Sequence, residues 1–148
     1  MIIKATLKEL DDLVGLFDAY RVFYKKESAL ALGREFLKAR LDRNESHIFI
    51  AYRGSVPAGF TQLYPKYSSA RLVQNWILND LYVAEDFRRL GIGEQLIAEA
   101  MQFAKLQGAD FVQLETQVEN FTAQALYHKM GFELQTPDQE FLIFKKLT

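Results

Sequence analysis

Two glycines stand between a strand-like segment and the most regular helical segment of the chain, in the run Arg88-Arg89-Leu90-Gly91-Ile92-Gly93. Glycine lets a backbone approach a ligand closely, and the first N–H groups of a helix have no partner inside it. Because those N–H groups carry the positive end of the helix dipole, they favour an anion, usually a phosphate. The run therefore predicts a phosphate-binding turn, although the same residues also suit an ordinary helix start.

Two familiar phosphate-binding motifs do not fit this turn. No Gly-Lys-Ser/Thr follows it, which excludes a Walker loop. A dinucleotide fingerprint needs a third Gly or Ala, and Glu94 and Gln95 stand at that place.

A second segment that could do chemistry runs from Asn120 to Phe132. Asn120 can cap a helix, and Gly131 can end it. Between them lies Tyr127, whose phenol has an ordinary pKa of about 10 and could give a proton to a departing thiolate. The alternative is that Tyr127 is a half-buried aromatic residue beside a core leucine.

The composition limits the chemistry that these segments can do. The chain has 148 residues, 49% hydrophobic and 25% charged, which suits one globular domain over residues 1–148. It has no cysteine, which excludes disulfides, thiolate metal sites and a cysteine nucleophile, and we expect no metal. A net charge of −1 offers no cationic field for nucleic acid. Without a signal peptide or a membrane span, we expect a cytoplasmic protein with no membrane partner.

The hydrophobic periodicity predicts the elements that must position these residues. Helices are expected over 6–24, 28–41, 91–107 and 120–130. Strands are expected over 2–5, 47–52, 56–64, 73–83, 111–116, 132–134 and 140–146. This order predicts an α/β (α+β) fold with a mixed sheet flanked by helices.

Together the two segments resemble the signatures of the GNAT superfamily of N-acetyltransferases. Val83–Gly93 is similar to its acetyl-CoA motif, Arg/Gln-x-x-Gly-x-Gly/Ala after a strand that ends in Val, with Arg88, Gly91 and Gly93 in the named positions. Asn120–Phe132 is similar to its second signature, Asn-x-x-Ala-x-x-Leu-Tyr-x-x-x-Gly-Phe.

The resemblance implies a single-domain GNAT-like fold with a mostly antiparallel sheet of about seven strands and about four helices. The strands that end near Val83 and Thr116 would splay, and acetyl-CoA would lie in the gap. The resemblance places the acetyl-CoA contacts at Leu81, Val83, Arg88, Arg89, Leu90, Gly91, Ile92, Gly93, Glu94, Asn120 and Tyr127.

The implied reaction is direct transfer of acetyl from acetyl-CoA to a primary amine in a ternary complex, which makes the protein an acyltransferase. Tyr127 would be the general acid. A lysine-type amine has a pKa of about 10.4 and arrives protonated, so a base is needed. Asp80 is the first candidate, although an Asp there also suits a strand-edge cap or ion pair, and Glu115 is the weaker candidate.

The acceptor is open to more than one interpretation. Asn79–Val83 is similar to the Glu-Asp-Leu/Phe-Tyr-Val run of diamine acetyltransferases, but Asn79 replaces an acidic residue, which leaves polyamine specificity open. We expect the acceptor to contact Tyr20, Tyr24, Asn79 and Asp80, although aromatic residues at helical spacing also suit a core. There are two alternatives. The protein could be a protein-lysine acetyltransferase, or it could be a CoA-binding regulatory module without turnover.

The end of the chain carries one further expectation. Phe141–Phe144 is apolar enough to form a homodimer contact, as in many members of the superfamily. The same run also suits a strand buried on both faces.

Overall fold

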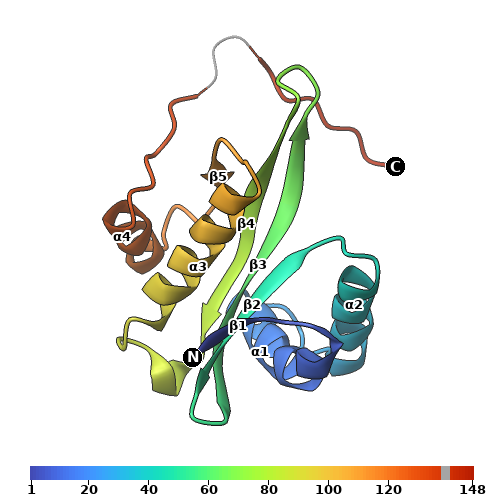
Figure 1. Ribbon diagram of the computed structural model, residues 1–148, viewed down its shortest axis with the longest axis vertical. Coiled ribbons are helices and arrows are strands. Elements are labelled where there is room, and N and C mark those ends of the chain that lie inside the picture. Colours follow the sequence, from blue (N-terminus) through green and yellow to red (C-terminus); the bar gives the residue numbers. More distant parts are fainter. Residues whose placement is uncertain (138–140) are drawn as a thin grey trace. The chain divides into compact units, whose positions relative to one another are not determined.

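A computed structural model describes residues 1–137 and 141–148 (Figure 1). The chain divides into two compact units, Met1–Glu115 and Thr116–Thr148. The elements are, in chain order, β1 (Ile2–Lys4), η1 (Leu7–Glu9), α1 (Leu10–Phe23), α2 (Leu30–Asp42), β2 (His47–Arg53), β3 (Val56–Ser68), β4 (Val73–Val83), η2 (Glu85–Phe87), α3 (Ile92–Leu106), β5 (Val112–Gln113) and α4 (Phe121–Lys129). None of the helices in the described residues is long and apolar enough to cross a membrane.

The first unit is built on one mixed sheet in the order β1-β2-β3-β4-β5. All neighbours are antiparallel except β4 and β5, which pair in parallel over Trp76–Ile77 and Val112–Gln113 only. β4 continues to Val83, so no described strand pairs with its β5-side edge from Leu78 to Val83. β5 ends at Gln113, so the parallel pairing stops there while β4 runs on.

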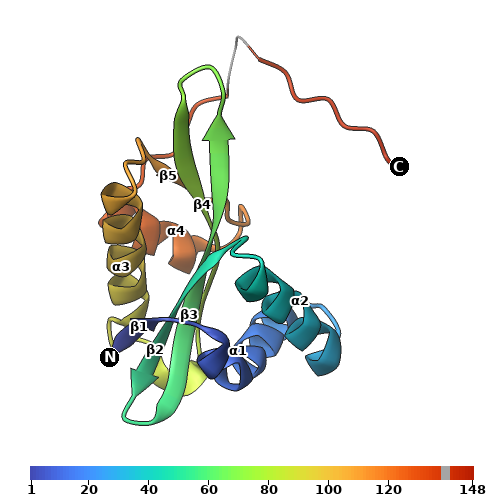
Figure 2. The same cartoon turned by 45° about the vertical axis from the view of Figure 1, so that its right-hand side comes forward.

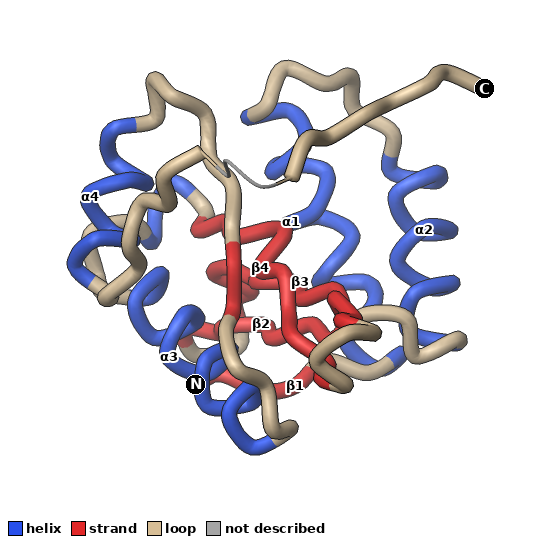
Figure 3. Tube along the Cα trace, turned by 90° about the horizontal axis from the view of Figure 1, so that it is seen from above, coloured by secondary structure: helices blue, strands red, loops and turns tan. Residues whose placement is uncertain are grey.

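Helices cover both faces of this sheet, with α1 and α2 on one side and α3 on the other (Figure 3). The core on the α1 side is apolar because helical spacing turns one face of α1 toward alternate strand residues. It includes Leu13 and Phe17 from α1, Ile48 and Ile50 from β2, and Phe60 from β3.

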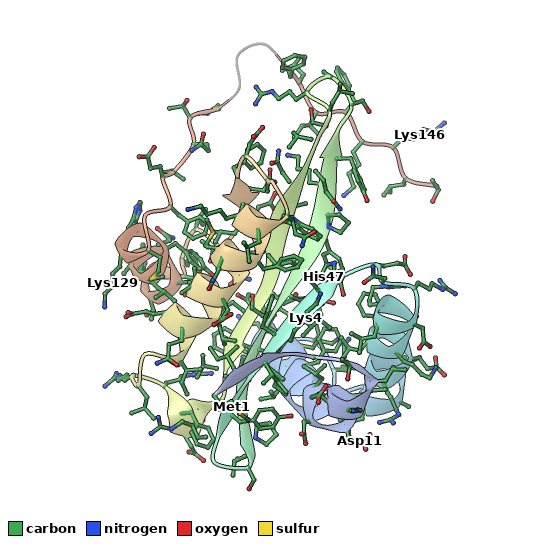
Figure 4. All side chains as sticks on the ribbon, in the orientation of Figure 1. Met1, Lys4, Asp11, His47, Lys129 and Lys146 are labelled. Carbon is green, nitrogen blue, oxygen red and sulfur yellow. The ribbon has the colours of Figure 1, made fainter. Side chains whose placement is uncertain are left out.

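α3 packs on the other face of the sheet, where aromatic side chains meet. The His47 ring lies 5.0 Å from Trp76 and 4.6 Å from Phe103, measured between ring centroids. Burial, and then the nearby Lys4 ammonium, lower the pKa of His47 to about 4. Both side chains are labelled in Figure 4. His47 is therefore neutral at physiological pH and serves here as a packing residue.

β3 and β4 form a long hairpin that extends past the other strands (Figure 2), and it contains one irregularity. Gln62 pairs with Asp80 and the next residue, Leu63, pairs with Leu78, which leaves Asn79 without a partner in the register. Such a β-bulge changes the face to which later side chains point.

The effect of the bulge is visible in the packing of the even-numbered residues of β4. Before it, Trp76 packs on Phe103 of α3, with ring centroids 5.1 Å apart. After it, Tyr82 packs on Tyr20 of α1, with ring centroids 6.4 Å apart. The bulge therefore turns Asp80 toward α1.

The prediction of seven strands is wrong in its last two members. Residues 132–134 and 141–146 form no strand, and Glu140 lies outside the described residues. β5 is also shorter than the predicted 111–116. A strand exists only where another strand accepts and donates its backbone hydrogen bonds, and an apolar run does not supply that partner. The α/β class and the four helices are confirmed.

Candidate active site

The glycine turn lies where the sequence predicts it, between β4 and α3. Gly91 is the N-cap of α3 with φ of +78°, a left-handed conformation that favours glycine. As a glycine, the N-cap residue has no side chain with which to cap the helix. The start of this 15-residue helix therefore suits a pyrophosphate as partner of its first N–H groups.

The two arginines before this turn differ in their surroundings. Arg88 donates from Nε to the backbone oxygen of Val83 at 2.9 Å, and its guanidinium lies over the rings of Phe23 and Tyr82. Arg89 is exposed and also has a positive φ of +63°. Arg88 therefore connects the turn to one aromatic residue of α1 and one of β4, whereas Arg89 remains on the surface.

The remaining predicted cofactor contacts of the first unit lie at the end of β4 and in the first turn of α3. Leu81 and Val83 are half-buried in β4, and Leu90 is exposed. Ile92 is buried, so its side chain belongs to the core and only its backbone can meet a ligand. Gly93 and Glu94 follow in the first turn, half-buried.

We expect Gly91→Val to weaken coenzyme A binding by about tenfold. A β-branched residue is strained in the left-handed region by about 1–2 kcal/mol, and tenfold in affinity corresponds to about 1.4 kcal/mol. Isothermal titration with coenzyme A measures the change.

Gly108→Val is the matched control for this variant. Gly108 lies just past the other end of α3 with φ of +81°, and a Cβ would meet no atom within 4 Å at either glycine. Equal affinities of the two variants would contradict a role of the turn in binding.

Asp80 is a buried carboxylate held by hydrogen bonds. It is 4% exposed, and it accepts from Gln62 Nε2 at 2.6 Å and from Asn79 Nδ2 at 3.0 Å. Burial raises its pKa above the ordinary value, against the opposing effect of the hydrogen bonds from Gln62, Tyr20 and Asn79. A raised pKa suits a carboxylate that must accept a proton.

The predicted acceptor residues gather around this carboxylate. Tyr20 is hydrogen-bonded to Asp80, and its ring centroid lies 5.0 Å from that of Tyr24. Both tyrosines are half-buried, and Asn79 is exposed. The weaker base candidate, Glu115, is exposed in the loop after β5. The structure thus brings Tyr20, Tyr24, Asn79 and Asp80 into one cluster of aromatic and polar side chains.

The second unit carries the other signature on α4. Asn120 caps this helix by accepting at Oδ1 from the backbone N–H of Ala123 at 3.2 Å. Gly131, with φ of +89°, follows the helix. Tyr127 is half-buried, with its ring centroid 6.0 Å from that of Phe132. The cap and the stop that the sequence predicts are therefore both present.

Sequence reasoning missed two members of the polar cluster, Gln62 and Ser46, which are both buried. A Gln within the mainly apolar first half of a predicted strand is the signal that the sequence offers. A hollow of about 440 Å³ lies by the β1–η1 bend and includes Ser46 in its lining, but none of the predicted site residues lines it.

No group of three or more His, Asp or Glu side chains in residues 1–137 and 141–148 is placed to hold a metal ion.

Comparisons with known proteins agree with the two signatures. The family described as "Acetyltransferase (GNAT) family" matches residues 13–132. An uncharacterized N-acetyltransferase of Bacillus subtilis (strain 168), YhfO, is 41% identical over 124 residues, covering 84% of this chain and 83% of that protein. A thialysine N-epsilon-acetyltransferase of Caenorhabditis elegans is 27% identical over 151 residues, covering 97% of this chain and 89% of that protein. The crystal structure of a probable acetyltransferase matches with a TM-score of 0.90 at 41% identity, covering 100% of this chain and 97% of that one.

Proposed function

The chain belongs to the acetyltransferase (GNAT) family and is an acyltransferase, and we propose that it transfers acetyl from acetyl-CoA directly to a primary amine. One observation carries this proposal: the strand that precedes the glycine turn also holds the buried Asp80 beside an aromatic cluster. We further propose that residues 1–148 act as one N-acetyltransferase domain, because the family match over 13–132 spans both units.

Acetyl-CoA, when bound, supplies the thioester. The backbone N–H groups from Arg89 to Glu94 hold its pyrophosphate, and Arg88 keeps the turn fixed on Val83. The open edge of β4 at Leu81 and Val83 offers backbone groups to the pantetheine amides and the acetyl carbonyl. Asn120, whose Oδ1 caps α4, offers its side-chain amide to the cofactor arm.

Asp80 accepts the proton that the acceptor ammonium must lose. One N–H bond of the ammonium breaks, the proton moves to a carboxylate oxygen, and the electron pair stays on nitrogen for attack on the acetyl carbonyl carbon. The N–H of Val83 stabilises the negative charge that develops on the carbonyl oxygen, by about 3–4 kcal/mol for such a donor. As the C–S bond breaks, Tyr127 gives its phenolic proton to the departing sulfur, and the phenolate takes up the second proton that the nitrogen loses on becoming an amide.

The acceptor that we favour is a small molecule with a lysine-type primary amine. The thialysine N-epsilon-acetyltransferase, by its name, acts on such an amine, and it aligns with 97% of this chain. Tyr20 and Tyr24 provide aromatic surface for the aliphatic part of the acceptor, and Asp80 provides negative charge for the ammonium. The exposed Asn79 supplies a neutral polar contact where diamine acetyltransferases carry an acid.

Thiol release from acetyl-CoA tests this function against the alternatives. The wild-type chain is incubated with a panel of small primary amines and with lysine-containing peptides. We expect thiol release with small lysine-type amines. Faster release with peptides would favour a protein-lysine acetyltransferase, and tight binding of acetyl-CoA without any thiol would favour a regulatory module.

We also propose a homodimer in which the apolar run Phe141–Phe144 is in contact with the second copy. Ile143 is 98% exposed within the chain, an exposure that is costly for a large apolar side chain next to others. Ile143→Asp is expected to convert a dimer into a monomer in sedimentation velocity. Leu72→Asp, at a residue that is 92% exposed in the β3–β4 hairpin, should stay dimeric. A monomeric wild type would contradict the proposal.

A further inference from the structure

A line of buried polar side chains leads from the start of β2 to Asp80. Ser46 and Gln62 are both buried, at 3% and 0% exposure. The Ser46 hydroxyl donates to Gln62 Oε1 at 2.7 Å, and Gln62 Nε2 donates to Asp80 Oδ2 at 2.6 Å. Three residues from different parts of the chain are thus joined in one hydrogen-bonded row.

The sheet register explains why this row reaches the carboxylate. Gln62 and Asp80 are direct partners in the β3–β4 pairing, at the position next to the bulge. Directly opposite residues on neighbouring antiparallel strands have side chains close enough to interact. The bulged residue, Asn79, then donates to the other carboxylate oxygen, Oδ1. Donors on both oxygens fix the plane of the carboxylate.

The orientation of the Gln62 amide is the decisive feature. A glutamine side chain can present either its oxygen or its NH₂ group to a neighbour. With Oε1 accepting from the Ser46 hydroxyl, the NH₂ group is the one that faces Asp80. The reversed amide would place an oxygen against the carboxylate, which is repulsive.

We propose that Gln62, held by Ser46, is a positioning residue for acetyl transfer, which fixes the Asp80 carboxylate for removal of the acceptor's proton. This inference rests on the proposed function and adds two residues that do not touch the acceptor or the cofactor. Gln62 acts through Asp80, and Ser46 acts through Gln62.

Two other titratable side chains face this carboxylate. Tyr20 of α1 is hydrogen-bonded to it. Burial, and then the charge of Asp80, raise the pKa of Tyr64 in β3 to about 12, so Tyr64 stays protonated at neutral pH. The hydrogen bond from Gln62 is the first of those that lower the pKa of Asp80 against its burial. Loss of Gln62 should therefore move the titration of Asp80 to higher pH.

The test replaces Gln62 with leucine in the full-length chain and measures two quantities. The carbon-13 resonance of the Asp80 carboxyl is followed against pH, and kcat is measured against pH with saturating acetyl-CoA. We expect Gln62→Leu to move the Asp80 titration and the acidic limb of kcat to higher pH. We also expect it to lower kcat about tenfold near neutral pH and to leave KM for acetyl-CoA unchanged. Ser46→Ala should shift the Asp80 titration and lower kcat in the same direction, but by less.

Thr61→Val is the matched control for a general loss of a buried hydrogen bond. Thr61 is fully buried beside Gln62 and donates to the backbone oxygen of Asp80 at 2.8 Å, so it does not touch the carboxylate. The pH profile of kcat and the Asp80 titration of the Thr61→Val chain should match those of the wild type. An unmoved Asp80 titration in an active Gln62→Leu chain, or equal shifts in both variants, would overturn this inference alone. A wild-type chain that releases no thiol with any acceptor would overturn the proposed function as well.

Discussion

Asp80→Asn is expected to lower kcat by about 10²–10⁴-fold, because an amide cannot take the proton of an ammonium ion. Burial raises the pKa of Asp80, so the wild-type kcat should fall as the pH drops through that pKa and the base becomes protonated. The variant should lose this acidic limb of the pH profile. Steady-state kinetics with a reactive amine, across the pH range in which the fold persists, measure both effects.

Asp86→Asn is the control for the lost charge. Asp86 is an exposed carboxylate in η2, on the segment between β4 and α3. Its removal changes the net charge by the same amount and should leave kcat and its pH profile unchanged. If Asp80→Asn kept the wild-type kcat and its acidic limb, another group would be the base.

The second large effect concerns the other proton transfer. Tyr127→Phe is expected to lower kcat by about 10²–10⁴-fold and to leave the affinity for acetyl-CoA nearly unchanged, because the variant keeps the ring and loses only the phenolic hydroxyl. The ring and its packing against Phe132 remain. Stopped-flow measurement of thiol release, together with a binding titration, separates the two quantities.

Tyr67→Phe is the matched control for the loss of a phenol. Tyr67 is exposed in β3, and its hydroxyl accepts a hydrogen bond from the nearby Gln74 at 3.2 Å. Its removal should leave turnover unchanged. Wild-type turnover in Tyr127→Phe would exclude Tyr127 as the acid.

The sequence predicts well those features that depend on neighbouring residues. α3 begins at the glycine turn because Gly91 can adopt a left-handed conformation, and α4 begins at Asn120 because its side chain caps the helix. Helical spacing and end signals are local, so each can be recognised within a window of a few residues. The four helices were predicted for this reason.

Features that depend on distant partners were predicted less well. Residues 141–146 begin with an apolar run and were expected to form a strand, but no strand forms there, because pairing is a property of two segments. The contact between Gln62 and Asp80 joins residues 18 positions apart, and it depends on the register of a hairpin that contains a bulge. Strict alternation along β4 would have placed Asp80 on the same face as Trp76.

The bulge at Asn79 has a consequence for how this sequence can change in length. Because Asn79 is the extra residue, its deletion would leave Leu78 opposite Leu63 and Asp80 opposite Gln62, in a regular ladder. Loss of a residue elsewhere in β4 would shift one half of the strand by one place and turn its side chains over. Deletion of Asn79 can therefore keep the carboxylate on the α1 face, whereas loss of a residue between Asp80 and Val83 turns over the side chains on one side of that gap.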